Sequence, residues 1–356
     1  MAFIHGLTLV EPPYKHRQDA ILSFMLKHFA ASSKESRMLA SAFAGSGIDT
    51  RFSILPDFSA GMGAPQLFIG AHLPNISARM ALYKLWAARL MAEAAQRTIE
   101  KARITAQAIT HLVTFSCTGL SNPGVENTLL KTCGLAATVE THFINFAGCH
   151  GAFKAIKLAK SLARSYEGNA RILVCGVELC TLHFMPGTTG DQIRANTIFS
   201  DGCAGFIVSS EAPSDQPAYA IESHQQAAIT DAEDLMSWNI GESAFFMTLS
   251  SKIDQALKGF NLPQFVGKFS RSSQAKVACH PGGKSILDCV RQQLDHCEDT
   301  SLAGSYKVLK NFGNMSSISI LKVLEDEFRL QTQHLTAIGF GPGLTVEGLA
   351  LQLQTA

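Results

Sequence analysis

The chain has almost no net charge and no long apolar run. Its 30 lysines and arginines nearly equal its 29 aspartates and glutamates, which leaves a formal net charge of +1. Composition therefore gives no indication of a nucleic acid or a charged membrane surface as partner. Because no stretch of about 18 consecutive apolar residues occurs, we expect no membrane-spanning helix. Residues 1–6 lack a charged region and soon reach Pro12, which excludes a typical secretion signal.

Closely paired cysteines are also missing. Nine cysteines are scattered through the chain, and no two of them form a Cys-x-x-Cys pair. Such pairs are typical of zinc sites and redox motifs, so we predict no metal site. Scattered thiols in odd number favour reduced cysteines and a cytoplasmic enzyme.

Apolar residues are plentiful, making up 46% of the 356 residues, enough for a large core. Runs rich in β-branched and aromatic residues alternate with helical patterns, which indicates an α/β fold. Strands are expected near 1–15 (with a Pro turn), 109–115, 171–175, 198–209 (as a strand pair or hairpin) and 219–224, and helices near 16–30, 77–100 and 250–258.

The segment 210–217, which contains two prolines, is the best candidate for a linker. The parts on either side of it follow a similar plan. Each has a strand, a polar residue at a junction, a helix and a Gly-rich strand pair, at 199–209 in the first part and 338–353 in the second. We therefore predict two similar halves, residues 1–212 and 213–356.

Cys149 is the most informative residue. Residues 139–146 before it favour a buried strand, and the apolar residues after it recur at helical spacing, namely Phe153, Ile156, Ala159 and Ala163. The thiol is thus expected at a helix N-terminus, where unpaired backbone N–H groups favour an anion. Together with a nearby imidazole, this position would lower the pKa of the thiol. The simpler interpretation is a buried core cysteine, the commoner fate of this residue.

Two more polar residues occupy comparable junctions. His280 follows the strand-like residues 275–279 and opens a His-Pro-Gly-Gly turn that leads into an expected helix. Asn314 follows the run 306–309, which we interpret as a strand, and precedes a helical stretch that continues to Phe328. Each residue alone is more simply explained as structural. Together, a thiol, an imidazole and an amide supply a nucleophile, a proton-transfer group and an oxyanion donor.

These motifs together resemble a type III polyketide synthase of the chalcone and stilbene synthase superfamily. Cys149 lies in Gly-Cys-His-Gly, His280 in His-Pro-Gly-Gly and Asn314 in Gly-Asn-Met-Ser-Ser, and a Gly-Phe-Gly-Pro-Gly motif follows at 339–343. The segment 116–124 resembles the family's CTG…PG segment, with a spacing similar to that of bacterial members. The resemblance spans nearly the whole chain. Its departures, at Ala152, Phe153, Glu126, Ser200 and Ala244, concern the shape of the substrate cavity and remove no catalytic group.

The resemblance implies the five-layered αβαβα thiolase-like fold, in which two similar halves enclose the active site. It implies that Cys149, in the first half, accepts an acyl group from a coenzyme A thioester. His280 and Asn314, in the second half, would stabilise the enolate formed when malonyl-CoA loses carbon dioxide. The expected substrates are an acyl-CoA starter and malonyl-CoA, with no further cofactor, and the expected assembly is a homodimer.

The resemblance also indicates residues that bind the substrate: Phe199, Phe245, Thr118, Lys34, Arg37 and Gly283. The two phenylalanines match the pair that gates the passage between the CoA tunnel and the cavity. The two basic residues match the pair that contacts CoA phosphates. The alternative for the two phenylalanines is that they are ordinary core residues. The alternative for the two basic residues is that they belong to a solvated helix face.

Other protein classes remain as alternatives. A ketoacyl synthase that condenses once shares the Cys-His-Asn set but typically carries HQAN- and GNTSA-like segments. A papain-like protease has the same residue order but needs a CGSCW-like segment, which this chain lacks. A non-catalytic acyl-binding homologue would not need all three polar residues. The bacterial similarity favours a medium or long aliphatic starter and a pyrone or resorcinol product, while the number of extensions stays open.

Overall fold

The computed structural model describes residues 1–30, 32–69, 73–186, 189–294 and 302–355. Within them, one large mixed sheet contains β1 (Phe3–Val10), β4 (His111–Ser116), β5 (Glu140–Asn145), β6 (Arg171–Leu179), β7 (Asp201–Ser209), β8 (Ala218–Ala228), β11 (Lys276–Cys279), β12 (His334–Gly341) and β13 (Thr345–Gln354). The strand order is β11-β12-β13-β8-β1-β7-β6-β4-β5. Since β1 and β8 pair only through Phe3 with Ala220 and Ile4 with Tyr219, the sheet consists of two smaller sheets joined along a short seam.

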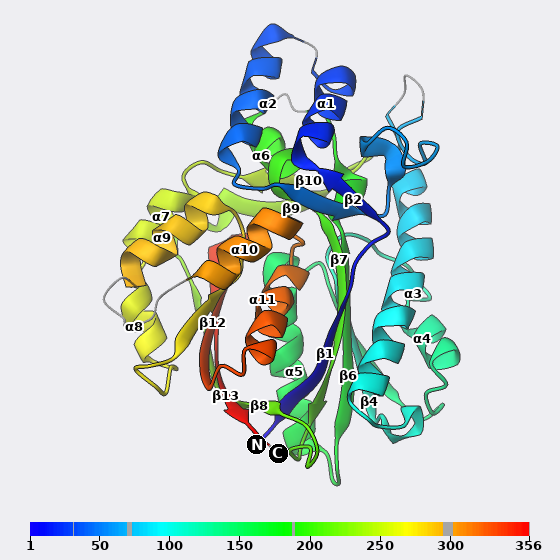
Figure 1. Cartoon of the computed structure of the whole chain (residues 1–356), viewed down its shortest axis with the longest axis vertical. Coiled ribbons are helices and arrows are strands. Elements are labelled where there is room, and N and C mark those ends of the chain that lie inside the picture. Colours follow the sequence, from blue (N-terminus) through cyan, green and yellow to red (C-terminus); the bar gives the residue numbers. More distant parts are fainter. Residues whose placement is uncertain (31, 70–72, 187–188, 295–301, 356) are drawn as a thin grey trace.

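Helices cover both smaller sheets and fill the space between them. The α-helices of the described residues are α1 (Gln18–His28), α2 (Ser33–Gly45), α3 (Ile76–Lys101), α4 (Glu126–Thr132), α5 (Gly151–Ser165), α6 (Gly190–Ile198), α7 (Ile253–Gly259), α8 (Leu262–Gly267), α9 (Lys284–Leu294), α10 (Ala303–Phe312) and α11 (Ile318–Arg329). Helix α3 packs along β1, β6 and β7, whereas α5 and α11 contact each other and lie between the sheets (Figure 1). With α9 and α10 beside β11 on the far side, these are the five layers of the expected thiolase-like fold.

The two central helices are buried because they are apolar on most sides. On α5, Ala152, Ala155 and Ala159 are fully buried, and their small side chains allow close approach of the neighbouring strands. On α11, every residue from Ile318 to Glu325 is buried. A helix that is apolar on most sides is stable only inside a core. Cys149 immediately precedes α5 and Asn314 shortly precedes α11, so both residues lie near the N-terminal ends of the central helices.

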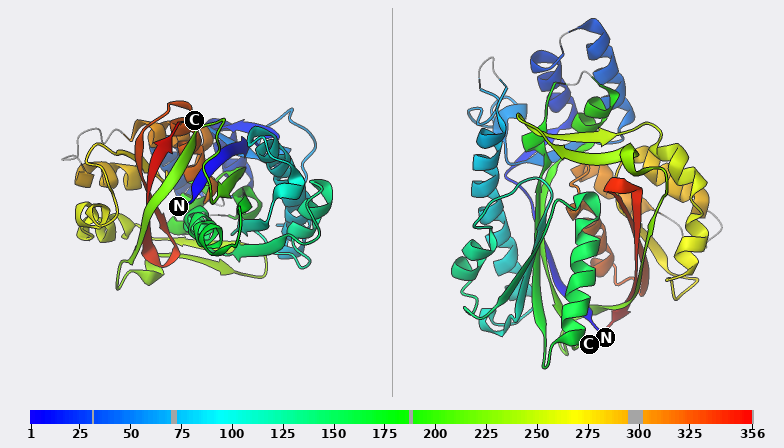
Figure 2. Two further views of the ribbon diagram at one scale, coloured as in Figure 1. Left: turned by 90° about the horizontal axis from the view of Figure 1, so that it is seen from below. Right: turned by 180° about the vertical axis from the view of Figure 1, so that it is seen from behind.

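Two short antiparallel sheets lie outside this core. One pairs β2 (Tyr14–Arg17) with β3 (Thr50–Ser53), and the other pairs β9 (Met236–Ile240) with β10 (Phe245–Leu249). They lie, with α1 and α2, toward the end of the molecule opposite the two chain termini, which are side by side (Figures 1 and 2).

Much of the predicted order of elements is confirmed. The strands expected near 1–15, 109–115, 171–175 and 219–224 correspond to β1, β4, β6 and β8, and the three predicted helices correspond to α1, α3 and α7. The segment 210–217 connects β7 to β8 without regular structure. The division into halves at 212 and 213 stays a prediction.

Three predictions are wrong. The strand predicted as buried at 139–146 is β5, which lies at the end of the large sheet and has no buried residue. The run 306–309 belongs to α10, because Ser305, Val308 and Leu309 form one buried helix face; four residues are too few to distinguish the two periodicities. The expected strand pair at 198–209 is the single strand β7, which follows directly on the end of α6. All nine residues of β7 are buried, as is typical of a strand covered on both faces.

The described part of the chain has no helix long and apolar enough to cross a membrane. Its cysteines are free thiols, while Cys297 lies outside the described residues. Nor does this part of the chain bring three or more His, Cys, Asp or Glu side chains together as metal ligands.

Candidate active site

Cys149 lies in a one-turn 3-10 helix, Gly148–His150, between β5 and α5. The residue is 6% exposed. The chain reaches it through two left-handed residues, Phe146 with φ 60° and Gly148 with φ 69°. A phenylalanine with positive φ is uncommon and is typical of a tightly constrained functional turn. The predicted position of the thiol at a helix N-terminus is confirmed.

The turn at Cys149 is packed against the Gly-Phe-Gly-Pro-Gly motif. A Cβ atom on Gly148 would lie 2.4 Å from the ring of Pro342, and one on Gly341 would lie 1.9 Å from Nδ1 of His150. Neither position can hold a larger residue without displacement of the facing segment. The motif therefore fixes the backbone of the cysteine turn, which explains why glycine is needed at both positions.

His280 follows β11 and is 1% exposed. Its backbone N–H donates to the carbonyl of Ile338 at 2.8 Å. Within the described residues, neither ring nitrogen has a hydrogen-bond partner. Burial lowers the pKa of His280 to about 3, so the imidazole is neutral at neutral pH. A buried neutral imidazole with both nitrogens unpaired can accept or donate a proton to a bound molecule.

Asn314 is held at the end of the turn after α10. Its Nδ2 donates to the carbonyl of Gly282 at 3.0 Å, and its Oδ1 accepts from the backbone N–H of Ser316 at 2.9 Å. An amide has two N–H donors, so one remains for another acceptor. The bond to Gly282 ties Asn314 to the turn that carries His280.

The structure brings Asn314 and Cys149 together. Burial raises the pKa of the Cys149 thiol to about 12, and hydrogen bonds from the side chains of Ser316 and Asn314 act in the opposite direction. The raised pKa differs from the lowered value that we expected, because removal of the thiol from water outweighs the helix terminus and the neighbouring donors.

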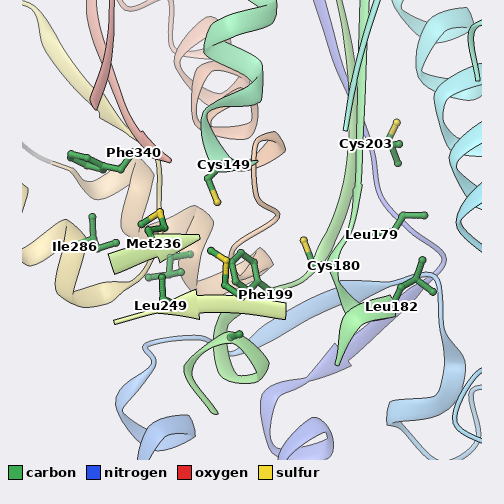
Figure 3. Packing of buried hydrophobic residues seen from close by; sticks show 14 of the residues in the cluster. Cys149, Leu179, Cys180, Leu182, Phe199, Cys203, Met236, Leu249, Ile286 and Phe340 are labelled. Atoms are coloured by element: carbon green, nitrogen blue, oxygen red, sulfur yellow. The ribbon is translucent and has the colours of Figure 1, made fainter. Parts of the chain in front are cut away.

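Cys149 lines a small, mainly apolar cavity of about 20 Å³. The lining residues are Cys117, Thr118, Gly148, Cys149, Cys180, Phe199, Trp238, Met247, Ser316 and Pro342. Figure 3 shows the Cys149 sulfur directed away from α5 toward Phe199. Of the predicted substrate-binding residues, Thr118 and Phe199 thus lie in the cavity with the thiol.

Phe245 lies one layer further away. It lines an adjoining cavity of about 10 Å³, together with Phe199, Trp238 and Met247. Its ring stacks on His183 at 4.3 Å between centroids, and its backbone N–H donates to Nδ1 of the same histidine. Phe199 thus lines both small cavities, as do Cys180, Trp238 and Met247, whereas Phe245 lines only the second.

A larger cavity of about 360 Å³ lies between α2, the end of α6 and the start of α9, and Ile198, the residue before Phe199, lines it. Gly283 and Gly282 line it, as do Ser41 and Gly45 of α2. The predicted residues Lys34 and Arg37 do not line it, but both are exposed in the first turns of the same helix. Arg37, Ser41 and Gly45 are spaced four residues apart, so they share one helix face.

Sequence reasoning missed a buried carboxyl group beside this site. Glu178 is 1% exposed, and its Oε2 accepts from the backbone N–H of Cys117 at 3.0 Å and from the hydroxyl of Thr118 at 3.2 Å. The hydroxyl of Ser317 donates to its Oε1. Burial raises the pKa of Glu178 to about 7, although these hydrogen bonds act in the opposite direction. A glutamate inside an otherwise apolar strand was the only signal in the sequence.

Trp238 and Met247 were also missed, because they come from the unpredicted hairpin β9–β10. The indole Nε1 of Trp238 donates to the carbonyl of Cys117 at 2.7 Å, which fixes the hairpin over the cavity. Both side chains line both small cavities. Both residues reach the cavity through contacts between segments far apart in the chain, and such contacts produce no pattern in the local sequence.

Comparison with known proteins agrees with this geometry. Residues 49–212 match the family model for the N-terminal domain of chalcone and stilbene synthases, and residues 223–354 match that for the C-terminal domain. The chain is 30% identical to a bisdemethoxycurcumin synthase of Oryza sativa subsp. japonica, over 80% of this chain and 75% of the relative. It is 29% identical to a probable polyketide synthase 1 of Dictyostelium discoideum, over 68% of this chain but only 8% of that much longer relative.

A solved structure shows the same fold. The structure of PKS-I from the brown alga Ectocarpus siliculosus superposes with a TM-score of 0.91 at 27% identity, covering 99% of this chain and 98% of that one. The match extends through both halves, including the segments that carry Cys149, His280 and Asn314. This chain therefore belongs to the chalcone and stilbene synthase family, the type III polyketide synthases.

Proposed function

We propose that this chain loads an acyl group from a coenzyme A thioester onto Cys149, extends it repeatedly with malonyl-CoA and cyclises the product. The observation that carries the proposal is a buried imidazole and a buried amide close to one buried thiol. His280 is buried with both ring nitrogens unpaired among the described residues. The Asn314 amide donates to the Gly282 carbonyl and also bonds to the Cys149 thiol, so it lies beside the sulfur.

In the loading step, Sγ of Cys149 bonds to the thioester carbonyl carbon of the starter. The thiol proton passes to His280, whose ring has a lone pair for it because burial keeps the imidazole neutral. Since burial also makes the ring a weak base, the proton must move as the bond between sulfur and the carbonyl carbon forms. The bond from the carbonyl carbon to the CoA sulfur then breaks, and the CoA sulfur leaves with that proton. The raised pKa of the cysteine makes such proton removal necessary, since little free thiolate exists at neutral pH.

In the extension step, malonyl-CoA loses its carboxylate as carbon dioxide, and the electron pair of the broken C–C bond forms an enolate. Negative charge develops on the thioester oxygen. Two neutral donors, one from His280 and one from Asn314, stabilise that oxygen, and each such donor contributes about 3 kcal/mol in other enzymes. The enolate carbon then bonds to the acyl carbon on Cys149, and the cysteine sulfur leaves.

We propose that coenzyme A occupies the cavity of about 360 Å³ that Ser41, Ile198 and Gly283 line. Gly283 has open space above its Cα, which allows a ligand to approach the backbone. Arg37 lies on the helix face that leads to this cavity, and Lys34 lies one turn before it, so both cations are placed to meet phosphates. No cofactor besides the thioester substrates is required by this chemistry.

We propose a medium or long aliphatic starter and a pyrone or resorcinol product. The lining of the inner cavities is rich in cysteine, phenylalanine, tryptophan and methionine, and no charged side chain lines the cavity of Cys149. An apolar chain gains most from such a surface. Its free volume of about 20 Å³ is too small for a growing chain, so the side chain of Met247, which among the described residues has no anchoring hydrogen bond like that of Trp238, must move during extension.

We propose that the chain forms a homodimer through β5. This strand lies at the end of the large sheet and pairs only with β4 within the described residues. Its Phe143 is 61% exposed, and an exposed apolar edge strand is prone to pair with another chain. A second copy related by a two-fold axis would cover it. Light scattering at micromolar concentration should give twice the 38.3 kDa mass of one chain.

The experiment that tests the proposed function follows carbon dioxide and products separately. Release of labelled carbon dioxide from malonyl-CoA is expected, together with polyketide products when hexanoyl, octanoyl, dodecanoyl or coumaroyl thioesters are supplied. A product extended only once would indicate a single-condensation ketoacyl synthase instead. Acyl binding without carbon dioxide release would indicate a non-catalytic homologue. A cytoplasmic location stays a prediction.

A further inference from the structure

Arg51 is a fully buried cation whose hydrogen bonds go to backbone carbonyls. It lies on β3 with no exposed surface. Its Nη1 donates to the carbonyls of Asn196 at 2.7 Å and Phe199 at 2.8 Å. The guanidinium lies between the rings of Phe43 and Phe184, each 5.4 Å from the guanidinium carbon. The group is thus held by two aromatic rings and by the two hydrogen bonds of Nη1.

This arrangement is costly for the folded state. Burial lowers the pKa of Arg51 to about 9, while the nearby charge of Asp201 acts in the opposite direction. Within the described residues, Nε and Nη2 have no hydrogen-bond partner. The carboxylate of Asp201 is already engaged by Ile54 and Thr181. A buried cation with unpaired donors is less stable than a well-packed apolar residue would be, so stability alone does not explain an arginine here.

The carbonyls that Arg51 holds belong to the segment that touches Asn314. The backbone N–H of Asn314 donates to the carbonyl of Ile198 at 2.8 Å, and its own carbonyl accepts from the N–H of Ser200 at 2.9 Å. These two bonds form a parallel bridge between Phe199 and Asn314. The position of the Phe199 backbone thus fixes that of Asn314.

Arg51 contacts the turn before Asn314 from the other side as well. Gly313 has φ 68°, and a Cβ atom there would lie 2.9 Å from Cγ of Arg51 and 2.9 Å from the carbonyl oxygen of Ile198. The turn therefore fits between the arginine stem and the end of α6. One side chain controls both the cavity wall at Phe199 and the turn that presents the Asn314 amide.

We propose that Arg51 is a positioning residue for decarboxylation, which fixes the Phe199 backbone and, through it, the Asn314 amide. The proposal rests on the proposed role of Asn314 as an oxyanion donor. Arg51 touches no substrate and acts only through these two segments. Its loss should displace the amide from the developing charge while the Cys149 turn, held by the Gly-Phe-Gly-Pro-Gly motif, stays in place.

The test compares the two half-reactions in Arg51→Met and Arg51→Lys. In Arg51→Met, the turnover number for decarboxylation of malonyl-CoA should fall by about tenfold to a hundredfold, as expected for a misplaced catalytic group. Its KM and the single-turnover acylation of Cys149 should change by less than about threefold. Arg51→Lys keeps the charge and a donor, so it should restore part of the decarboxylation.

Gly313→Ala provides an independent variant, because it disturbs the same contact without removing the arginine. It should show the same selective loss. Lys157→Met is the matched control. It removes a largely buried cation, bonded to Glu347 at 2.6 Å, from α5, away from the Phe199–Asn314 bridge. If Lys157→Met affects activity, it should slow decarboxylation and acylation by the same factor.

Normal decarboxylation by folded Arg51→Met would overturn the proposal. It would also be overturned if decarboxylation and acylation fell by the same factor and the melting temperature fell with them, because the effect would then be a general loss of stability. A crystal structure of Arg51→Met gives a readout that does not depend on activity. We expect the Phe199 carbonyl and the Asn314 amide to be displaced, and unchanged positions would also overturn the proposal. Absence of decarboxylation in the unmodified chain would instead refute the proposed function, before any variant is compared.

Discussion

The amide Nδ2 of Asn314 donates a hydrogen bond to the carbonyl of Gly282 at 3.0 Å. This bond joins two segments that approach the site from different elements, the end of α10 and the turn after β11. It uses one N–H of the amide and thereby fixes the direction of the other. Asn314 is thus oriented by the same turn that carries His280, which is the arrangement required of two donors that share one oxyanion.

The two half-reactions should separate in variants of Cys149 and Asn314. Cys149→Ala should lose starter loading and all polyketide product but still release carbon dioxide from malonyl-CoA, because the enolate donors remain. Asn314→Ala should still acylate Cys149, whereas its decarboxylation should fall by about 10²–10³-fold, the usual effect of losing one oxyanion donor. Acyl-enzyme mass spectrometry and labelled carbon dioxide release measure the two steps.

His280→Ala should impair both half-reactions, since in the proposed function the imidazole takes the thiol proton in one step and donates to the enolate in the other. Peptide mapping should find the acyl group on Cys149 alone in the unmodified chain. An acyl label on Cys117 or Cys279 with Cys149 unmodified would contradict the assignment, as would normal decarboxylation by Asn314→Ala.

Removal of the Ser316 hydroxyl should make the Cys149 thiol harder to ionise. The hydroxyl interacts with the thiol and lowers its pKa against the effect of burial. Loss of a hydrogen bond to the anion raises the pKa of the group. Alkylation of Cys149 by iodoacetamide in Ser316→Ala should therefore require a higher pH than in the unmodified chain.

Ser317→Ala is the matched control for Ser316→Ala. The hydroxyl of Ser317 donates to Glu178 rather than to the thiol. Its removal should leave the pH profile of alkylation closer to that of the unmodified chain. Equal shifts in the two variants would mean that the Ser316 hydroxyl has no specific effect on Cys149.

The sequence alone was sufficient for the parts of the site that depend on local chain geometry. Cys149 and His280 follow strands and precede helices, and glycines beside them permit the close turns that the structure contains. The same reasoning failed at 306–309, where four residues fit a strand as well as the helix face of α10. It also predicted the wrong direction for the pKa of Cys149, because burial depends on the whole core.

The residues that shape the cavity could not be predicted. Trp238 and Met247 reach Cys149 through a hairpin that packs across the site, and Glu178 is buried by strands from both sides. These contacts join residues far apart in the chain, so the periodicity of a short stretch of sequence cannot predict them. The same is true of Arg51, whose partners lie near residue 199.

Trp238 should limit the length of chain that the cavity accepts. Its indole lines both small cavities and is fixed by its bond to the carbonyl of Cys117. Trp238→Ala would join and enlarge these spaces. The ratio of kcat/KM for dodecanoyl-CoA over hexanoyl-CoA should rise by about tenfold or more, since each added methylene in an apolar pocket is worth about 1–3 kcal/mol.

Trp86→Ala is the control for this substitution, because Trp86 lies on α3 and lines neither small cavity. It should leave the ratio unchanged. A Trp238→Ala protein that is folded and active but keeps the original chain-length preference would show that other side chains limit the cavity.

The stability of the fold should decrease steeply in acid. Burial lowers the pKa of His150, His183 and His280 to about 3 and that of His5 to about 4. An unfolded histidine titrates near pH 6.5, so below that pH the unfolded chain binds more protons than the folded chain. Unfolding is then favoured as the pH falls, and the loss continues until the folded pKa is reached.

Two buried carboxyl groups act in the opposite sense over part of this range. Burial raises the pKa of Glu178 to about 7 and that of Asp201 to about 6. Between these values and the normal pKa of a carboxyl group near 4, the folded chain binds more protons, so acid stabilises it. Because the four histidines outnumber the two carboxyl groups, the free energy of unfolding should fall from about pH 6.5, more slowly while the carboxyl effect lasts and more steeply below about pH 4, where only the histidine effect remains.

His5→Gln tests this balance outside the active site. His5 is 3% exposed and lies on β1, and glutamine cannot be protonated in this range. Denaturant unfolding from pH 7 to pH 3.5 should show a shallower loss of stability in the variant, because one fewer proton is taken up on unfolding below pH 6.5. An identical slope in both proteins would mean that His5 is protonated in the folded state and that burial does not hold it neutral.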